Sequence, residues 1–415
     1  MTEKTGLYIH IPFCVRKCNY CAFLSFDAET SPRREYADAV VNEITRRAEE
    51  LGHPEIDTVY VGGGTPSVLD LSQMRDIMHA VNKHFRVKED AEVTIEANPA
   101  TLGRKDGVML AKLQAYKYMG FNRLSMGVQS MNNDRLRYLG RIHTAENVAR
   151  DMELIRRKGF DNVNLDLMFS IPGESTADAL DDLRRILALS PEHISCYSLQ
   201  IEEGTPFGEM AASGELTEIP DEDDRRTYHE ICRMLDEAGY EHYEISNFAK
   251  KTDDAGGPSL YRSRHNSLYW DMSDYIGIGL GASGFTGGRR YKNTSDIAEY
   301  IEFFRELPVP GIDSSEIPLE EEHVNSSFDN ISEAVFTGLR RREGISYEEA
   351  LAAFARGGDG GTAASAGDEF WRIFSEAKEE AEEYARRGLL VIDDEGLKLT
   401  EQGIDISNSI MSLFV

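Results

Sequence analysis

Six short apolar runs recur through the first 240 residues, and a longer amphipathic stretch follows most of them. The runs read LYIHI, TVYVGG, EVTIEA, RLSMGV, NVNLDLM and HISCYSL, and the helix-like stretches cover residues 33–51, 71–85, 105–118, 144–158 and 177–189. Strands that alternate with helices in this way are typical of βα units around a parallel sheet. We therefore predict an α/β fold in which six βα units occupy residues 5–240, as an open sheet or a barrel.

Polar or glycine-rich residues close several of the predicted strands. They are residues 62–66 in GGGTP, Glu96 and Asn98 in EANP, Gln129, and Asp166. In parallel α/β sheets and barrels, ligands bind at the carboxyl ends of the strands. The sequence therefore predicts that these residues lie around one binding site.

The pattern of the sequence changes after residue 240. Residues 241–295 include the aromatic and glycine-rich segment SRHNSLYWDMSDYIGIGLGASGF, which we interpret as an extension of the core that residues 1–240 form. From residue 296 to residue 415 the sequence is mainly helical, and GLLVIDDEGLKLTEQGIDISNSI near its end predicts a short hairpin followed by a helix. We expect a small, mostly helical C-terminal domain there, of winged-helix type in one interpretation.

The net charge of −28, from 73 acidic and 45 basic side chains, predicts a strongly anionic surface. Such a surface repels nucleic acids and anionic lipid headgroups unless a basic patch reverses the field, and the sequence shows no such patch. No apolar run approaches the ~20 residues that cross a bilayer, and MTEKTG lacks the pattern of a secretory signal. We expect a cytoplasmic protein that binds no nucleic acid and does not insert into a membrane.

Three of the five cysteines lie within eight positions, as Cys14, Cys18 and Cys21 of CVRKCNYC. In a reducing compartment this spacing favours metal binding over disulfide bonds. A structural zinc site needs four ligands, and only His10 could complete a Cys₃His set, through a sharp bend of its strand. Three inert core thiols are another alternative, and an iron–sulfur cluster is the interpretation that we favour.

The number of cysteines has its own chemical meaning. A four-iron cluster takes one outer ligand per iron, usually a cysteine thiolate. Three cysteines in a C-x₃-C-x₂-C loop leave one iron open, and a small molecule can bind there through nitrogen and oxygen. Two thiolates would hold the cluster poorly, and four would close it.

The loop CVRKCNYC resembles the cluster loop of the radical S-adenosylmethionine superfamily. The motifs LYIHIPFC, GGGTPS, EANP, GFNRLSMGVQS, LGRIHT, NLDLM, YEISNFA and HNSLYW together resemble its branch of oxygen-independent coproporphyrinogen III oxidase-like proteins, and within that branch the heme chaperones. This resemblance covers nearly the whole chain. It implies a partial (β/α)₆ TIM-like barrel, a [4Fe-4S] cluster on Cys14, Cys18 and Cys21, and S-adenosyl-L-methionine at the open iron.

The resemblance also implies the residues that bind S-adenosylmethionine. Tyr8 matches a tyrosine near the methionine moiety, and Gly63, Gly64 and Thr65 belong to a loop whose peptide groups receive the methionine ammonium. Other matching positions around the cofactor are Glu96, Gln129, Arg141, Asp166 and Gln200. Without the resemblance, Tyr8 is a core aromatic residue, and the glycine run is a phosphate-binding loop that lacks its lysine.

Two functions follow from the resemblance. One is a heme chaperone that passes heme to an acceptor protein, and the other is a radical enzyme that decarboxylates coproporphyrinogen III; an electron donor for the cluster is implied. The oxidases have a further cysteine at the position of Phe23, so the chaperone is favoured. His265 of HNSLYW matches a motif associated with heme, and a neutral imidazole is a natural axial ligand of heme iron. A hydrogen-bonded core histidine is the alternative.

Overall fold

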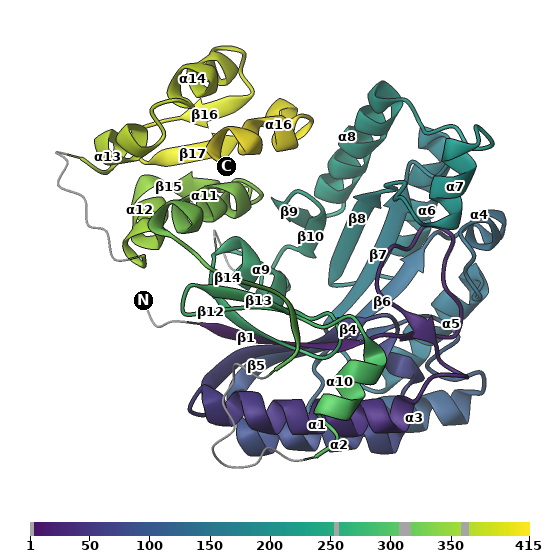
Figure 1. Ribbon diagram of the computed structural model, residues 1–415. Helices are drawn as coiled ribbons and strands as arrows, with labels where there is room; N and C mark the ends of the chain where they lie inside the picture. Colours follow the sequence, from purple (N-terminus) through teal and green to yellow (C-terminus); the bar gives the residue numbers. More distant parts are fainter. Residues whose placement is uncertain (1–3, 253–256, 307–316, 358–364) are drawn as a thin grey trace.

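The computed structural model describes residues 4–252, 257–306, 317–357 and 365–415. A twelve-stranded sheet lies at the centre of the molecule (Figure 1). Its strands, in spatial order, are β14 (Leu319–Val324), β13 (Arg289–Asn293), β12 (Ser283–Thr286), β11 (Asp274–Ile278), β1 (Thr5–Ile11), β4 (Glu55–Gly63), β5 (Arg86–Ala97), β6 (Arg123–Gln129), β7 (Val163–Phe169), β8 (His193–Ser198), β10 (Asn247–Lys250) and β9 (Tyr240–Glu244).

The six strands β1, β4, β5, β6, β7 and β8 run parallel to one another and coincide with the six predicted runs. Five helices begin and end within two residues of the predicted stretches: α1 (Arg33–Glu50), α2 (Leu71–His84), α3 (Asp106–Tyr118), α5 (Ala145–Arg157) and α6 (Thr176–Leu187). The predicted α/β fold with a partial (β/α)₆ barrel is therefore confirmed. The barrel stays open, because β11 extends the sheet beside β1 and β10 extends it beside β8.

Local sequence explains why these elements form where they do. Leu7, Ile9 and Ile11 of β1 are fully buried, as expected for a strand in a sheet that is covered on both faces. The helices α5 and α6 each begin with a capping box, on Thr144 and Ser175 respectively. A capping box satisfies backbone N–H groups that have no partner inside the helix, so it marks the first turn.

Shorter elements surround the carboxyl ends of the parallel strands. The cysteine loop runs between β2 (Phe13–Cys14) and β3 (Phe26–Asp27), which pair with each other in parallel. The remaining elements of this part are η1 (Pro66–Val68), α4 (Asn133–Tyr138), α7 (Pro206–Ala212), α8 (Asp221–Glu237), α9 (Arg264–Trp270) and α10 (Ile297–Phe303).

The last part of the chain is mostly helical, as predicted. It contains α11 (Ser327–Gly338), β15 (Ile345–Ser346), α12 (Tyr347–Ala355), α13 (Ala366–Ile373), α14 (Lys378–Arg386), β16 (Leu390–Ile392), β17 (Gly396–Leu399), α15 (Glu401–Ile404), α16 (Ser407–Met411) and η3 (Ser412–Phe414). The strands β16 and β17 form the predicted hairpin, and β15 pairs with β17. In Figure 1 this yellow-green region lies near α9, on the side of the barrel away from the purple cysteine loop.

The predicted boundary at residue 296 separates elements that the fold holds together. Helix α10 contacts α1, and β14 pairs with β13 of the main sheet. Residues 297–303 and 319–324 therefore lie with the barrel, and the three predicted domain ranges stay predictions. Among the described residues, none of the helices is both long enough and apolar enough to span a membrane.

Candidate functional site

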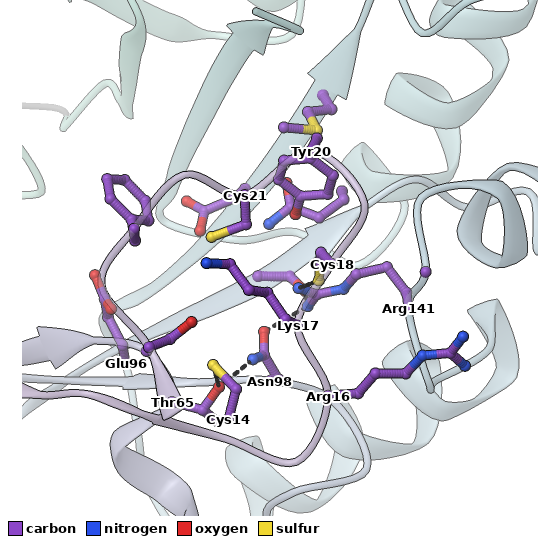
Figure 2. A pocket seen from close by; sticks show the side chains of 18 of the residues that line it. Cys14, Arg16, Lys17, Cys18, Tyr20, Cys21, Thr65, Glu96, Asn98 and Arg141 are labelled. Atoms are coloured by element: carbon purple, nitrogen blue, oxygen red, sulfur yellow. Dashed lines mark hydrogen bonds between the residues drawn. The ribbon is translucent and has the colours of Figure 1, made fainter. Parts of the chain in front are cut away.

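A cavity of about 500 Å³ opens where the parallel strands end (Figure 2). It brings together the ends of β4, β5, β6 and β8, two residues of β7, and the cysteine loop. The predicted site residues that line it are Cys14, Cys18, Cys21, Gly63, Gly64, Thr65, Glu96, Gln129, Arg141, Asp166 and Gln200. The other two predicted site residues, Tyr8 and His265, are not part of the lining.

The cysteine loop is fixed to the barrel through Asn19. The Asn19 backbone N–H donates to the carbonyl of Leu139 at 3.0 Å, and its Nδ2 donates to the carbonyl of Tyr138 at 2.8 Å. The Asn19 carbonyl in turn accepts a hydrogen bond from the N–H of Phe207 at 2.9 Å. These bonds hold the middle of the loop, so that Cys14, Cys18 and Cys21 lie around the cavity (Figure 2).

The surroundings of the three thiols bear on the choice between zinc and an iron–sulfur cluster. A zinc ion needs all its ligands within about 2.3 Å of one point. Within the described ranges, no three His, Cys, Asp or Glu side chains converge closely enough to hold a single metal ion. His10 is also engaged, because its Nδ1 lies 2.8 Å from the Tyr8 hydroxyl and its Nε2 lies 3.4 Å from the Leu24 carbonyl.

A four-iron cluster fits the same donor set better. Each cysteine ligand of such a cluster binds a different iron, so the sulfur atoms stand apart around a volume. Burial raises the pKa of the Cys14 and Cys21 thiols, so these groups lose their protons when a metal binds. The cationic side chains of Arg141 and Lys17 also line the cavity and favour the thiolates. The residues therefore fit a [4Fe-4S] cluster.

A hydrogen-bonded chain connects two of the three cysteines. The Thr65 hydroxyl lies 3.6 Å from Cys14 Sγ and accepts a hydrogen bond from Asn98 Nδ2 at 2.8 Å. Asn98 Oδ1 accepts from Arg141 Nη2, and Arg141 Nη1 donates to Cys18 Sγ at 3.6 Å. Figure 2 shows this chain across the floor of the site. The loops after β4 and β5 and the segment after α4 are thereby held in one arrangement.

Strand β6 has a glycine, Gly127, at the position where three polar side chains converge. A Cβ atom at Gly127 would lie 2.8 Å from Asn98 Oδ1, 3.0 Å from Gln129 Nε2 and 3.3 Å from Arg141 Nη2. The register of β6 against β7 shifts between Gly127 and Gln129, and Gln129 has a φ of 69°. A positive φ in a residue other than glycine is uncommon and is found preferentially at functional sites. It agrees with the predicted role of Gln129.

The carboxyl groups of Glu96 and Asp166 both line the cavity, and that of Glu96 contacts the glycine loop. Glu96 accepts hydrogen bonds from the Tyr60 hydroxyl at 2.6 Å and from the Gly63 N–H at 3.0 Å. Burial raises the pKa of Glu96 to about 7, and it also raises the pKa of Asp166, which accepts a hydrogen bond from Asn164 at 2.7 Å. Glu96 can therefore hold a proton near neutral pH, which a bound ligand would displace or share.

The raised pKa of Glu96 predicts how stability depends on pH. The folded protein holds this proton more tightly than the unfolded chain does, so the free energy of unfolding falls as the pH rises from about 4.5 to about 7. For the Glu96→Gln variant, the free energy of unfolding is expected to fall less over this range. The difference is on the order of 2 kcal/mol, after screening by solvent in the cavity. Urea unfolding of the metal-free proteins at both pH values measures the difference, and parallel pH profiles would contradict the assignment.

Position 64 requires a glycine, because the backbone there closely approaches the segment before Cys14. Its N–H donates to the Ile11 carbonyl at 2.9 Å, and an added Cβ would lie 2.9 Å from both the backbone N and O of Phe13. We expect Gly64→Ala to lower the free energy of unfolding by about 1–3 kcal/mol and to reduce the iron bound per chain. The matched control is Gly107→Ala in α3, because no heavy atom lies within 4 Å of the added carbon. Equal iron contents in the two variants would contradict this account.

Tyr8 lies beneath the cavity, within a cluster of aromatic rings. Its ring is 6.2 Å from that of Tyr60 and 6.5 Å from that of His265. Because the Leu24 carbonyl only accepts, His10 donates through Nε2, and His10 Nδ1 accepts from the Tyr8 hydroxyl. Tyr8 thus supports the strand that leads to the cysteine loop, and its contact with the methionine moiety stays a prediction.

His265 lies in α9, which contacts β1 and β4, and its ring lies 5.0 Å from that of Tyr60, whose hydroxyl donates to Glu96 in the cavity wall. Its side chain is 1% exposed, with Nδ1 2.7 Å from the Thr58 hydroxyl and Nε2 2.8 Å from the Tyr269 hydroxyl. The Glu92 carboxylate accepts from the N–H groups of Arg264 and His265. Both ring nitrogens are thus engaged, and the role of His265 as a heme ligand stays a prediction.

The sequence prediction places Asn98 at the site without a binding role, and it does not single out Tyr20 or His143, which also line the cavity. The strand-end position of Asn98 in EANP was a usable signal, but its contacts to Thr65 and Arg141 depend on the folded loops. His143 follows Arg141 by two positions in LGRIHT. Nothing in its local sequence distinguishes it from a core histidine.

Comparison with known proteins identifies two family models that match this chain. The family model of the radical SAM superfamily matches residues 8–186, and that of the HemN C-terminal domain matches residues 326–406. The heme chaperone HemW of Bacillus subtilis is 33% identical over 409 residues, 98% of each chain, and that of Escherichia coli is 37% identical over 294 residues, 70% of this chain and 73% of its own.

A solved structure supports the fold independently. Coproporphyrinogen III oxidase (HemN) from Escherichia coli superposes with a TM-score of 0.79 over 99% of this chain and 90% of that chain. Its sequence identity of 22% makes this likeness one of fold alone. Similarity to HemW, in contrast, extends along the whole sequence. The chain therefore belongs to the HemW family, within the radical SAM superfamily, whose membership implies a [4Fe-4S] cluster and S-adenosylmethionine.

Proposed function

We propose that this protein is a heme chaperone that binds a [4Fe-4S] cluster, S-adenosylmethionine and heme, and that delivers heme to an acceptor protein. The observation that carries the proposal is the single cavity wall formed by three cysteines and the polar ends of consecutive strands. Two relatives, one of which matches this chain along nearly its full length, are named heme chaperones. Their names support the part of the proposal that concerns heme. An electron donor for the cluster and a heme acceptor are the expected partners.

The residues of the cavity divide the work of holding the cofactors. Cys14, Cys18 and Cys21 would hold the cluster, which supplies single electrons and one open coordination position when it is bound. Arg141 would orient a carboxylate through its forked guanidinium, since it is already fixed by Asn98 and Cys18. The backbone around Gly63 would approach an ammonium group, with Glu96 beside it.

The polar side chains at the strand ends would bind the nucleoside. Gln129 and Asp166 offer hydrogen-bonding groups on neighbouring strands, and Gln200 follows β8 on the same wall. The cysteine loop forms one wall of the cavity, so that a bound ligand would lie between the loop and the barrel. We further propose a cytoplasmic location, because all five cysteines are free thiols.

Heme binding needs a ligand for the iron, and His265 can supply one only if a hydrogen bond opens. Its Nε2 is held by the Tyr269 hydroxyl, and its Nδ1 by that of Thr58. The Trp270 ring next to it contacts Arg340, whose guanidinium carbon lies 4.4 Å from the ring centre, so α9 also connects the barrel to the C-terminal region. Access of heme to His265 therefore requires α9 to move.

Two substrates separate the proposed function from its alternative. The chain is reconstituted anaerobically and offered either hemin or coproporphyrinogen III with S-adenosylmethionine and a reductant. A heme chaperone is expected to retain one hemin per chain and to form no protoporphyrinogen. Turnover of coproporphyrinogen would instead make the protein an oxidase, in spite of Phe23 at the position of the extra cysteine.

Variants of α9 test the role of His265 in the same assay. If this histidine ligates the iron, His265→Gln is expected to lose hemin and its axial-ligand spectrum, whereas Tyr269→Phe, which frees Nε2, retains both. His265 is buried, so the loss of its bonds is also expected to lower the free energy of unfolding by about 2 kcal/mol. Unfolding curves of both variants show whether lost hemin reflects lost structure. Full hemin retention by His265→Gln would exclude this ligand.

A further inference from the structure

Two buried side-chain atoms in the wall of the cavity have no hydrogen-bond partner within the described part of the chain. They are Ser25 Oγ and His143 Nδ1. A hydroxyl can rotate toward a new partner, so the serine carries little information. The histidine is different, because its ring is held in one orientation.

The orientation of His143 follows from its other nitrogen. Nε2 lies 3.1 Å from the backbone carbonyl of Val128, in β6. A carbonyl oxygen only accepts, so Nε2 carries the hydrogen and Nδ1 of the neutral ring is a bare acceptor. The side chain is only 3% exposed, and an acceptor buried without a partner is costly. Few such atoms persist in folded proteins without a functional reason.

The surroundings determine what kind of donor can reach His143. Burial, together with the nearby Arg141, lowers the pKa of His143 to about 3, so the ring is neutral at physiological pH. The same positive charge disfavours a cationic donor such as an ammonium group at this point. An uncharged O–H or N–H donor is favoured instead. His143 lines the cavity while its Nδ1 is buried, so the bond to a ligand would form as side chains adjust on binding.

We propose that His143 is a binding residue of the cavity and that its Nδ1 accepts a hydrogen bond from an uncharged donor on the nucleoside part of S-adenosylmethionine. This proposal rests on the proposed function, since it takes that cofactor as the occupant. The nucleoside has three donors of this kind, namely the two ribose hydroxyls and the adenine amino group. Its methionine part carries only a cationic donor.

Two conservative variants separate the nitrogens of the ring. In His143→Gln the side-chain amide can still donate to Val128 but has no acceptor at the position of Nδ1. In His143→Asn the amide oxygen takes the position of Nδ1, and the bond to Val128 is lost. If His143 is merely structural, the larger effect is expected in His143→Asn, which loses the bond to Val128. If His143 binds the ligand, the larger effect is expected in His143→Gln, which loses the acceptor.

The experiment is a thermodynamic cycle between protein and ligand. Equilibrium affinities are measured on the anaerobically reconstituted proteins for S-adenosylmethionine and for analogues that lack the 2′-hydroxyl, the 3′-hydroxyl or the 6-amino group. We expect one analogue to bind the wild type about tenfold more weakly than the parent, a loss that is absent in His143→Gln and retained in His143→Asn. The analogue that shows this pattern identifies the donor.

The possible outcomes separate a failure of the proposed function from a failure of the role of His143. Wild-type protein that fails to bind S-adenosylmethionine would overturn the proposed function. Wild-type protein that binds it, while every analogue loses the same affinity in all three proteins, would overturn only the role of His143 and would mean that Nδ1 is satisfied by water. Unfolding curves of the variants, recorded alongside, confirm that each comparison concerns folded protein.

Discussion

A Cys18→Ser variant, purified without oxygen, is expected to lose its iron and the brown colour of an iron–sulfur protein. Three thiolates are the fewest that hold a four-iron cluster with one open corner, so no spare ligand replaces the missing one. Cys18 also accepts a hydrogen bond from Arg141 at 3.6 Å, which serine would shorten and redirect. Iron and sulfide analysis of the variant, with its visible spectrum, measures the loss.

Cys232→Ser is the matched control for this prediction. Cys232 is a free thiol in α8 and is not part of the cavity lining. Its replacement is expected to leave the iron content unchanged. A Cys18→Ser protein that kept its iron and sulfide at the wild-type level would show that the cluster is held elsewhere or that no such cluster forms.

Removal of the Arg141 guanidinium is expected to have the second largest effect. Arg141 donates to Cys18 Sγ, to Asn98 Oδ1 and to the Gly127 carbonyl, so its loss leaves several groups beside the cavity unpaired. Hydrogen bonds from a charged donor are among the stronger ones, and we expect Arg141→Met to bind S-adenosylmethionine about 10- to 100-fold more weakly. Arg141→Lys keeps the charge but loses the fork, and an intermediate affinity is expected.

Arg137→Ala provides the control for a lost arginine in the same region. Arg137 is exposed in α4, where it pairs with Asp134, and it is not part of the cavity lining. The affinity of the Arg137→Ala variant for S-adenosylmethionine is expected to equal that of the wild type. Isothermal titration of the reconstituted proteins measures all three variants. Wild-type affinity in Arg141→Met would show that the ligand carboxylate lies elsewhere.

The parallel core could be predicted because its information is local. Each buried strand is a short apolar run, and three of the five helices begin with a capping box, on Asp70 before α2, Thr144 before α5 and Ser175 before α6. The strand-end rule then placed residues from distant parts of the sequence, including Glu96 and Gln129, on one cavity. That rule works because parallel strands in one sheet share a direction.

The remaining features depend on contacts between distant segments. The motif HNSLYW identifies His265, but its position depends on Thr58 in β4 and Glu92 in β5, which no local pattern reveals. The contacts of Asn98 and His143 likewise form only when the segments after β5 and α4 meet at Gly127 and Val128 of β6. The edge strand β14 was also missed, because LEEEHV is exposed along its length and lacks the apolar pattern of a core strand.

The proposed function requires a cluster that is held by three cysteines and keeps one coordination position vacant. Electron paramagnetic resonance of the reduced, oxygen-free protein, recorded before and after addition of S-adenosylmethionine, tests it most directly. We predict a four-iron signal that changes shape when the cofactor binds, because the cofactor becomes a ligand of one iron. A colourless protein with a single zinc ion, or a cluster signal that saturating S-adenosylmethionine leaves unaltered, would contradict it.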